Sequence, residues 1–292
     1  MDESGVTLDS GLRAVVRQDP YNSGGYELVV GGTPQSHVDL DDPSYLLYEY
    51  VRRMGHFVDL LPPGAITAIH LGAGALTLPR YIATLRPGSR QQVIELEEKL
   101  VELVRAKLPL PRGAAIRVRY GDARAVLGRL PAALRGAADL LVVDVFAGDR
   151  IPGHVTSLEF YRECLAFLAP AGIVLVNVAD GAGSAFARGQ AATVRMAVDD
   201  PIAGGSRVAV VAEPAVLKGR RFGNLVIAAS PTALPLDWMP RLVTAGPFPA
   251  ALVHGRELQD WIAGAPVVTD ATASGSPSAR REIFIEPPRS ER

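Results

Sequence analysis

The sequence predicts an α/β fold built on an open, mostly parallel sheet of seven strands, with a terminal antiparallel pair and a small N-terminal β-rich cap. Short apolar runs alternate with helix-like stretches from residue 65 to residue 178. The first of these runs enters a glycine turn, as a parallel strand does ahead of a helix. The last two strand-like runs, further along, are joined by too few residues for a helical crossover.

The central feature of the chain is a strand, a glycine turn and a helix start at residues 65–80. Five of the first seven residues are apolar, which is typical of a strand buried on both faces. Gly72 and Gly74 give the turn a backbone without side chains, and Pro79 suits the first turn of a helix. Free N–H groups at a helix start favour a bound ligand. Glycines also end strands for structural reasons, so the pattern alone leaves both interpretations open.

A carboxylate follows the glycines at the spacing that a nucleotide-binding fold uses. Residues 92–97 predict a second strand that carries Glu95, about 20 residues after the turn. A carboxylate has two oxygens that accept hydrogen bonds from vicinal ribose hydroxyls. The structural alternative, an acid that only starts a helix, suits Glu97 and Glu98 equally well, whereas for Glu95 we favour the ligand role.

Composition excludes several classes of function. The chain has 292 residues, 48% of them hydrophobic, and a net charge of −1, which gives no electrostatic case for nucleic acid or an anionic membrane as partner. Cys164 is its one cysteine and the five histidines show no metal-ligand spacing, so we expect no metal site. No stretch reads as a signal peptide or a membrane span, and we expect a cytoplasmic protein.

We divide the chain into three parts. Residues 1–62 form the cap and a linking helix, and residues 62–64, Pro-Pro-Gly, mark a hinge. Residues 63–235 form the main, ligand-binding domain. Residues 236–292 form a C-terminal extension, whose Ser-, Pro- and Arg-rich tail we expect to be mobile from about residue 271.

Within the cap, a polar lead precedes the first predicted strand at residues 26–32. Residues 38–42 are its expected hairpin partner, and residues 44–60 are expected to be helical.

Two further acids follow predicted strands. Asp122 comes after a third strand at residues 115–120, and it is either the N-cap of the next helix or an acceptor for an adenine amine. Asp144 ends a nearly all-apolar fourth strand at residues 138–144, at the carboxyl edge where open α/β sheets bind ligands. A carboxylate there is costly unless it is paired or used, so we favour a functional role for Asp144.

The rest of the sheet completes the predicted fold. Residues 145–155 are long enough to form a loop over the sheet edge, and the capping box at residues 156–159 opens a helix. Residues 173–178 predict a fifth strand, and residues 207–211 and 224–229 predict an antiparallel pair. This is the layout of the class I methyltransferase-like, or Rossmann-like, fold.

The order of these motifs resembles the spermidine synthase family, which are aminopropyltransferases with the methyltransferase fold. The resemblance covers roughly residues 26–230. It rests on the glycine turn, Glu95, residues 121–123, Asp144 and residues 157–161, together with residues 31–35, which look like the family's D-G-x-x-Q turn.

The resemblance implies decarboxylated S-adenosylmethionine as co-substrate, with no tightly bound cofactor, and a small amine as acceptor. It also makes a homodimer plausible. The matching donor-site positions are Gln35 and Glu95, with Glu95 on the ribose, and Asp122 and Ala123 on the adenine, beside the turn of Gly72 and Gly74.

Two acids match the catalytic part of the family pattern. Asp144 corresponds to the acid that handles the attacking amine, and Asp149 is a weaker match for a residue that holds a second ammonium. Aminopropyl transfer is an in-line displacement beside a sulfonium, so the residue that orients and deprotonates the amine matters most.

The sequence also departs from the family. Gly74 stands where the family's glycine loop has an aspartate, the next acid after Asp144 is five residues away instead of three, and the tyrosine motif near Tyr48 and Glu49 matches loosely. An acid at position 74 would repel the carboxylate of ordinary S-adenosylmethionine, so its absence leaves a methyltransferase as an alternative. A non-catalytic nucleoside-binding homologue is the other alternative.

Overall fold

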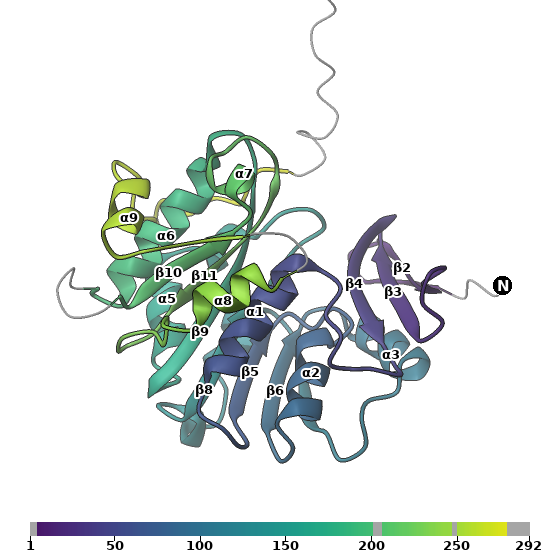
Figure 1. The fold of residues 1–292 in the computed structure, drawn as a ribbon. Helices are drawn as coiled ribbons and strands as arrows, with labels where there is room; N and C mark the ends of the chain where they lie inside the picture. Colours follow the sequence, from purple (N-terminus) through teal and green to yellow (C-terminus); the bar gives the residue numbers. More distant parts are fainter. Residues whose placement is uncertain (1–4, 201–205, 247–249, 279–292) are drawn as a thin grey trace, which may run out of the picture.

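The computed structural model describes residues 5–200, 206–246 and 250–278, which form two sheets with helices around the larger one (Figure 1). The strands of the larger sheet are β5 (Thr67–Leu71), β6 (Arg90–Glu95), β7 (Ala115–Tyr120), β8 (Ala138–Val143), β9 (Leu168–Asp180), β10 (Val208–Ala212), β11 (Gly223–Ala229) and β12 (Ala251–His254). Their order is β12-β10-β11-β9-β8-β5-β6-β7.

The strand directions confirm the predicted fold class. The five strands from β7 across to β9 run parallel, and β11 is antiparallel to both β9 and β10. The sheet has one strand more than the sequence analysis predicted, because β12 pairs antiparallel with β10. Those four residues lie in what was treated only as an extension.

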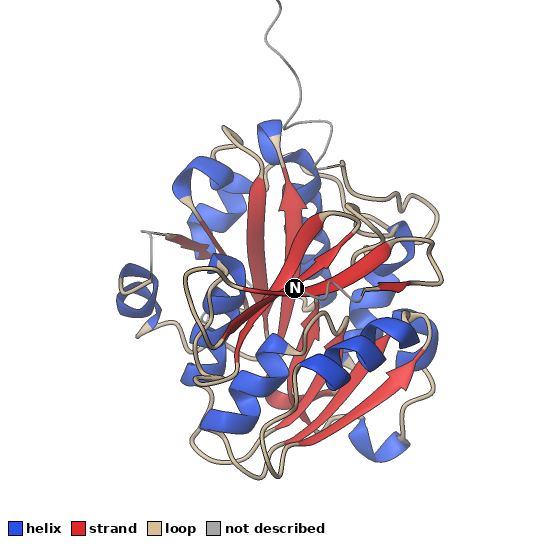
Figure 2. Cartoon of the chain, turned by 90° about the vertical axis from the view of Figure 1, so that its right-hand side faces the viewer, coloured by secondary structure: helices blue, strands red, loops and turns tan. Residues whose placement is uncertain are grey.

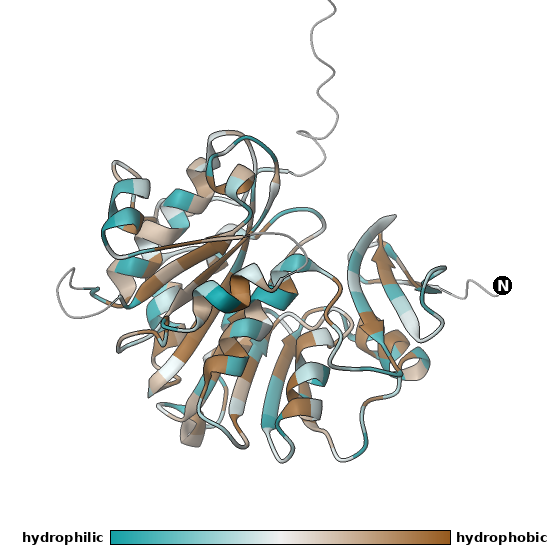
Figure 3. Cartoon of the chain, in the orientation of Figure 1, coloured by the Kyte–Doolittle hydropathy of each residue, from teal (hydrophilic) through white to brown (hydrophobic). Residues whose placement is uncertain are grey.

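Helices cover both faces of this sheet (Figure 2). They are α1 (Glu49–Leu60), α2 (Thr77–Leu85), α3 (Glu98–Lys107), α4 (Ala123–Leu127), α5 (Leu158–Leu165), α6 (Ala185–Ala197), α7 (Pro214–Leu217), α8 (Met239–Thr244) and α9 (Gly255–Trp261). Helices α1, α2 and α8 share one core with the sheet, and α4, α5, α6 and α9 share the other. The apolar strands between them are brown in Figure 3.

The N-terminal sheet has the order β1-β2-β3-β4 and packs on α3. Its strands are β1 (Val6–Thr7), β2 (Arg13–Gln18), β3 (Gly25–Val30) and β4 (Thr33–Asp39). Strand β3 forms a hairpin as predicted, but its partner β4 begins at Thr33 and not at the predicted residue 38, because Gly31 and Gly32, both at positive φ, close a two-residue turn. Strands β1 and β2 lie in the stretch that was interpreted as a polar lead. Leu28 and Val38 of this sheet share a core with Leu76 of the glycine loop, so the cap adjoins the expected site.

Turn chemistry shortens the helix that was expected from residue 44. The Ser44 amide donates to the Asp42 carboxylate at 3.0 Å, an Asx turn that competes with helix formation, and α1 begins at Glu49. At its other end, the buried Arg86 guanidinium donates to the carbonyls of Val58, Leu61 and Pro62. This side chain therefore satisfies carbonyls that the end of α1 leaves open.

The C-terminal segment was expected to be mobile from about residue 271, but it is packed as far as Ser278. The Ile151 amide donates to the Ser276 hydroxyl at 2.9 Å, and the Ser276 amide donates back to the Ile151 carbonyl at 3.0 Å. Ser276 and Ser278 are both buried. The rest of the expected tail, residues 279–292, lies outside the described residues.

The described residues contain neither a candidate membrane span nor a candidate metal site. No helix there is long and apolar enough to cross a membrane. No group of three or more His, Cys, Asp or Glu side chains in the same part of the chain is arranged to hold a metal ion.

Candidate active site

The glycine turn lies directly against the end of β8. Gly72 has a φ of +94° and Gly74 a φ of +48°, a region that favours glycine. A Cβ at position 72 would lie 2.1 Å from the carbonyl oxygen of Asp144, so no side chain fits there. The Asp144 amide in turn donates to the Leu71 carbonyl at 2.9 Å. The structure thus brings together the turn and the acid that sequence analysis predicted.

Glu95 joins the glycine turn to the start of α3 through its two carboxylate oxygens. One oxygen accepts from the Ala73 amide at 2.8 Å and the other from the Glu97 amide at 3.0 Å. Burial raises the pKa of Glu95, an effect that these amide donors partly offset. The amide of Leu96 also acts on this carboxylate, which has about four acceptor sites, so acceptor capacity remains for a ligand hydroxyl.

Glu97 has a structural role. Its carboxylate accepts from the Asp9 amide at 2.8 Å and from the Ser10 amide at 3.0 Å, which ties the N-terminal sheet to the start of α3. This supports the structural alternative that was left open for Glu97.

Asp144 lies in a polar cluster at the carboxyl edge of the sheet. Its carboxylate accepts from the Asn177 side-chain amide at 2.8 Å and from the Tyr50 hydroxyl at 3.4 Å. Burial of the carboxylate raises the pKa of Asp144, the two hydrogen bonds lower it, and the nearby negative charge of Glu95 raises it further. Part of the residue stays accessible to solvent.

Asn177 has an amide oxygen without a partner. The residue is 3% exposed, and this oxygen is buried with no hydrogen bond among the described residues. Buried polar atoms are rarely left in this state, so a vacant acceptor beside a carboxylate points to a ligand that donates N–H or O–H groups.

Asp122 is a helix cap, and it also binds a histidine. One carboxylate oxygen accepts from the Ala125 amide at 2.9 Å, and the other lies 2.7 Å from Nε2 of His154. Burial alone would raise the pKa of Asp122, but the amide and the imidazole bring it below its ordinary value. Ala123, at the start of α4, is buried. The N-cap interpretation is therefore realised, and the adenine role stays a prediction.

Gln35 lies on β4 next to the residue that contacts the glycine turn. The hydroxyl of Ser36 accepts from the Ala75 amide at 3.2 Å. A Cβ at Gly74 would come 2.5 Å from that hydroxyl oxygen. The place of the family's loop aspartate is thus partly filled by Ser36.

Asp149 is in the loop after β8, and its carboxylate accepts a hydrogen bond from the Ser278 hydroxyl. This contact joins it to the C-terminal segment, and its proposed contact with a second ammonium stays a prediction.

Three partners of the predicted acids were not predicted from the sequence: Tyr50 and Asn177, which contact Asp144, and His154, which contacts Asp122. Asn177 carried a signal, because it is a lone amide within the apolar strand that ends at Asp180. Tyr50 was overlooked in favour of its neighbours Tyr48 and Glu49, and it is Tyr50 that contacts Asp144. His154 lies in a loop, and its pairing with Asp122 has no sequence signal.

Comparison with known proteins supports the predicted relationship. The polyamine aminopropyltransferase of Neisseria meningitidis is 31% identical over 149 residues, which are 50% of this chain and 54% of that protein. A crystal structure of a probable spermidine synthase from Corynebacterium glutamicum matches with a TM-score of 0.82 and 28% identity, over 92% of this chain and 97% of that one. The chain is thus similar to the spermidine synthases in sequence and in fold.

Two qualifications define this relationship. The chain spans about half the length of the curated aminopropyltransferases that it matches, and no protein-family model matches it. Human methyltransferase-like protein 13 has the same general fold, with a TM-score of 0.51 at 14% identity, over 77% of this chain and 96% of that one. The chain therefore has a methyltransferase-like fold, as predicted.

Proposed function

We propose that this chain transfers an aminopropyl group from decarboxylated S-adenosylmethionine to a small amine. The observation that carries the proposal is the vacant amide oxygen of Asn177 beside the carboxylate of Asp144. Two adjacent acceptors, one charged, suit an ammonium or amine with several N–H donors. The similarity to aminopropyltransferases supports the same assignment.

The residues that would hold the donor line the carboxyl edge next to the glycine turn. Glu95 has acceptor sites for ribose hydroxyls, Asp122 and Ala123 lie at the start of α4, and Gln35 lies on β4 near the turn. When bound, the donor supplies a carbon attached to a sulfonium. The sulfur leaves as a neutral thioether, so the leaving group needs no acid.

Asp144 has two tasks in this proposal. Its carboxylate attracts the acceptor's ammonium, and it then takes the proton, so that the nitrogen lone pair can form the new C–N bond as the C–S bond breaks. A raised pKa makes Asp144 a better base than an exposed aspartate. Asn177 and Tyr50 orient the carboxylate, and the free oxygen of Asn177 receives one N–H of the amine.

One observation favours methyl transfer as the second candidate. Position 74 carries no acid, and Ser36 fills part of the space where one would lie. The chain therefore has no carboxylate at this point of the loop to repel the carboxylate of ordinary S-adenosylmethionine.

The test is to incubate the purified protein with each donor and a panel of small amines, and to identify the nucleoside product. Aminopropyl transfer releases methylthioadenosine, and methyl transfer releases S-adenosylhomocysteine. We expect methylthioadenosine, formed only when an amine is present. S-adenosylhomocysteine alone would favour the methyltransferase, and neither product with any amine would favour the non-catalytic homologue.

We also propose that the protein forms a homodimer and that it is located in the cytoplasm. Light scattering of the purified protein and fractionation of cells that express it would test them.

A further inference from the structure

The C-terminal segment, residues 268–278, lies against the loop between β8 and α5, residues 144–157. The Ile151 amide donates to the Ser276 hydroxyl at 2.9 Å, and the Ile151 carbonyl accepts from the Ser276 amide at 3.0 Å. A Cβ on Gly153 would lie 3.0 Å from the backbone of the segment, so the two stretches are in close contact. The proposed function assigns no role to this segment.

Arg124 of α4 joins the segment, the loop and α5. Its guanidinium donates to both carboxylate oxygens of Asp270, at 2.6 and 2.9 Å. It also donates to the Glu163 carboxylate at 2.7 Å and to the His154 carbonyl at 3.1 Å. The hydrogen bonds from Arg124 and Ser157 lower the pKa of Asp270 to about 2, so this carboxylate is charged at neutral pH. A bidentate pair of this kind fixes the relative position of its partners.

The loop held in this way borders the expected donor site. It begins at the end of β8, and its His154 lies 2.7 Å from the carboxylate of Asp122, which follows β7. Strands β5 and β6 lie between β8 and β7 in the sheet, and they lead into the glycine turn and Glu95. Asp122 and Ala123, the predicted adenine contacts, come directly before Arg124 in the chain. The loop and Arg124 are therefore both next to residues that would hold the nucleoside.

A loop beside a ligand site costs binding energy if the ligand has to order it, because the loop then loses conformational freedom. In this chain, contacts from the C-terminal segment already hold the loop. We infer that residues 268–278 act as a clamp, which keeps the loop between β8 and α5 in place for an adenine nucleoside before it binds. The inference rests on the proposed function, because this nucleoside is part of the proposed donor. Arg124, Asp270 and Ser276 are positioning residues in this arrangement.

The first test measures binding and turnover in Asp270→Ala and Ser276→Ala, which loosen the clamp at two different places. Calorimetric affinity for methylthioadenosine should fall roughly five- to tenfold in each, with a more unfavourable binding entropy, because the nucleoside now orders the loop. The KM for the donor should rise by the same factor, whereas kcat should stay within about twofold, since saturating donor restores the loop. A contact that only stabilises the fold would lower the melting temperature and leave the affinity and the KM unchanged.

Limited digestion with trypsin reports on the loop itself, without any turnover. Arg150 is exposed, and the peptide bond after it leads to Ile151, whose amide and carbonyl are both bound to Ser276. Cleavage there requires local opening of these contacts. We expect slow cleavage after Arg150 in the wild type, with or without methylthioadenosine. In Ser276→Ala, cleavage should be roughly tenfold faster, and methylthioadenosine should slow it again. Mass spectrometry identifies the fragment that ends at Arg150.

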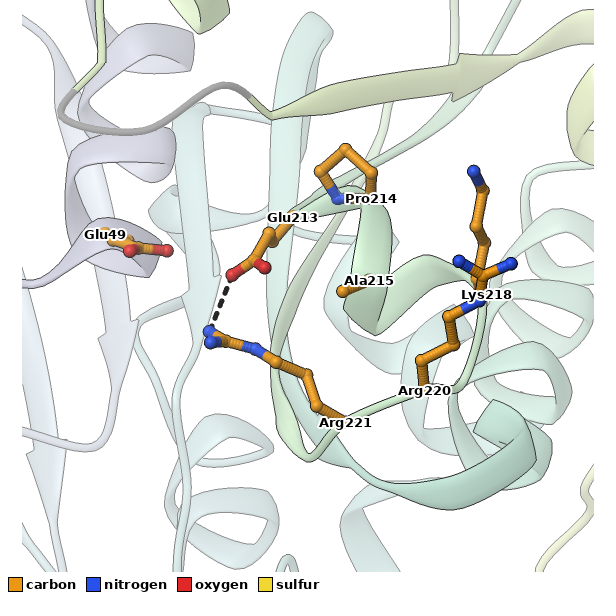
Figure 4. A pocket seen from close by; sticks show the side chains of 7 residues that line it. All are labelled: Glu49, Glu213, Pro214, Ala215, Lys218, Arg220 and Arg221. Atoms are coloured by element: carbon orange, nitrogen blue, oxygen red, sulfur yellow. Dashed lines mark ion pairs between the residues drawn. The ribbon is translucent and has the colours of Figure 1, made fainter.

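Glu213→Ala is the matched control, because it also breaks a pair between an acid and an arginine. Arg221 lies 2.6 Å from Glu213 in a cavity of about 490 Å³ between α1 and the connection from β10 to β11 (Figure 4). None of the residues that line this cavity belongs to the loop or to the clamp. This variant should change neither the affinity nor the cleavage rate. Asp270→Asn, which keeps one acceptor oxygen, should fall between Asp270→Ala and the wild type.

The outcomes separate this inference from the proposed function. Unchanged affinity for methylthioadenosine in both clamp variants overturns the clamp, even if cleavage of the loop becomes faster, and leaves aminopropyl transfer standing. If no amine is turned over, but both variants weaken nucleoside binding and speed cleavage, the clamp stands while the proposed function fails. A wild-type protein that binds no methylthioadenosine overturns both.

Discussion

Replacing Asp144 by asparagine tests the catalytic assignment most directly, because function and stability should change in opposite directions. Asparagine keeps the size of the side chain and can still accept from Asn177, whose own amide oxygen is vacant and can accept in return. It neither attracts an ammonium nor takes its proton. We expect turnover to fall by about 10²-fold or more, the usual scale for a positioned acid–base group.

The direction of the stability change follows from the pKa of Asp144. Burial raises this pKa in the folded chain above its value in the unfolded chain. The unfolded chain therefore releases the proton at lower pH, and the wild-type fold loses stability as pH rises through the interval between the two values. Asparagine does not titrate, so the melting temperature of Asp144→Asn relative to wild type should increase across this interval and then level off.

The assay combines a pH–rate profile with thermal unfolding at the same pH values, for wild type and variant. Asp139→Asn is the matched control, because Asp139 lies on the same strand and accepts from the Thr67 amide at the end away from the site. It should leave turnover unchanged and lower the melting temperature slightly. If Asp144→Asn instead keeps full turnover, or loses activity only in proportion to unfolding, Asp144 is structural and the proposed mechanism is wrong.

Four further outcomes are expected. Asn177→Leu should raise KM for the amine about tenfold, because one acceptor is lost, and should move the acid limb of the pH–rate profile upward; an unchanged profile would contradict this. Glu95→Gln should weaken calorimetric binding of methylthioadenosine by about 1–3 kcal/mol, unless the ribose binds elsewhere. The Gly74→Asp variant should be less stable than wild type, and adding Ser36→Gly should restore its stability. In competition binding, the double variant should prefer decarboxylated over ordinary S-adenosylmethionine more strongly than wild type does. Arg86→Met should lower the free energy of unfolding in urea by about 2–4 kcal/mol, because buried carbonyls lose their hydrogen-bond donor. A smaller change would show that water replaces the guanidinium as the donor.

Sequence reasoning succeeded where the local pattern and the fold point the same way. The mostly apolar strands at residues 67–71 and 138–143 were predicted correctly, because they are short and bounded by turns. Asp144 was found because a charge at the end of such a strand stands out. Strand β12 was missed because it has only four residues, and helix α6 was missed because its internal glycine and threonine weaken the helical signal.

The rest of the site could not be predicted because it depends on long-range contacts. The pairing of Tyr50 with Asp144 joins residues 94 positions apart, and which of two nearby tyrosines faces the sheet is decided by where α1 begins. That start was predicted five residues too early, since the turn formed by Asp42 and Ser44 was not recognised.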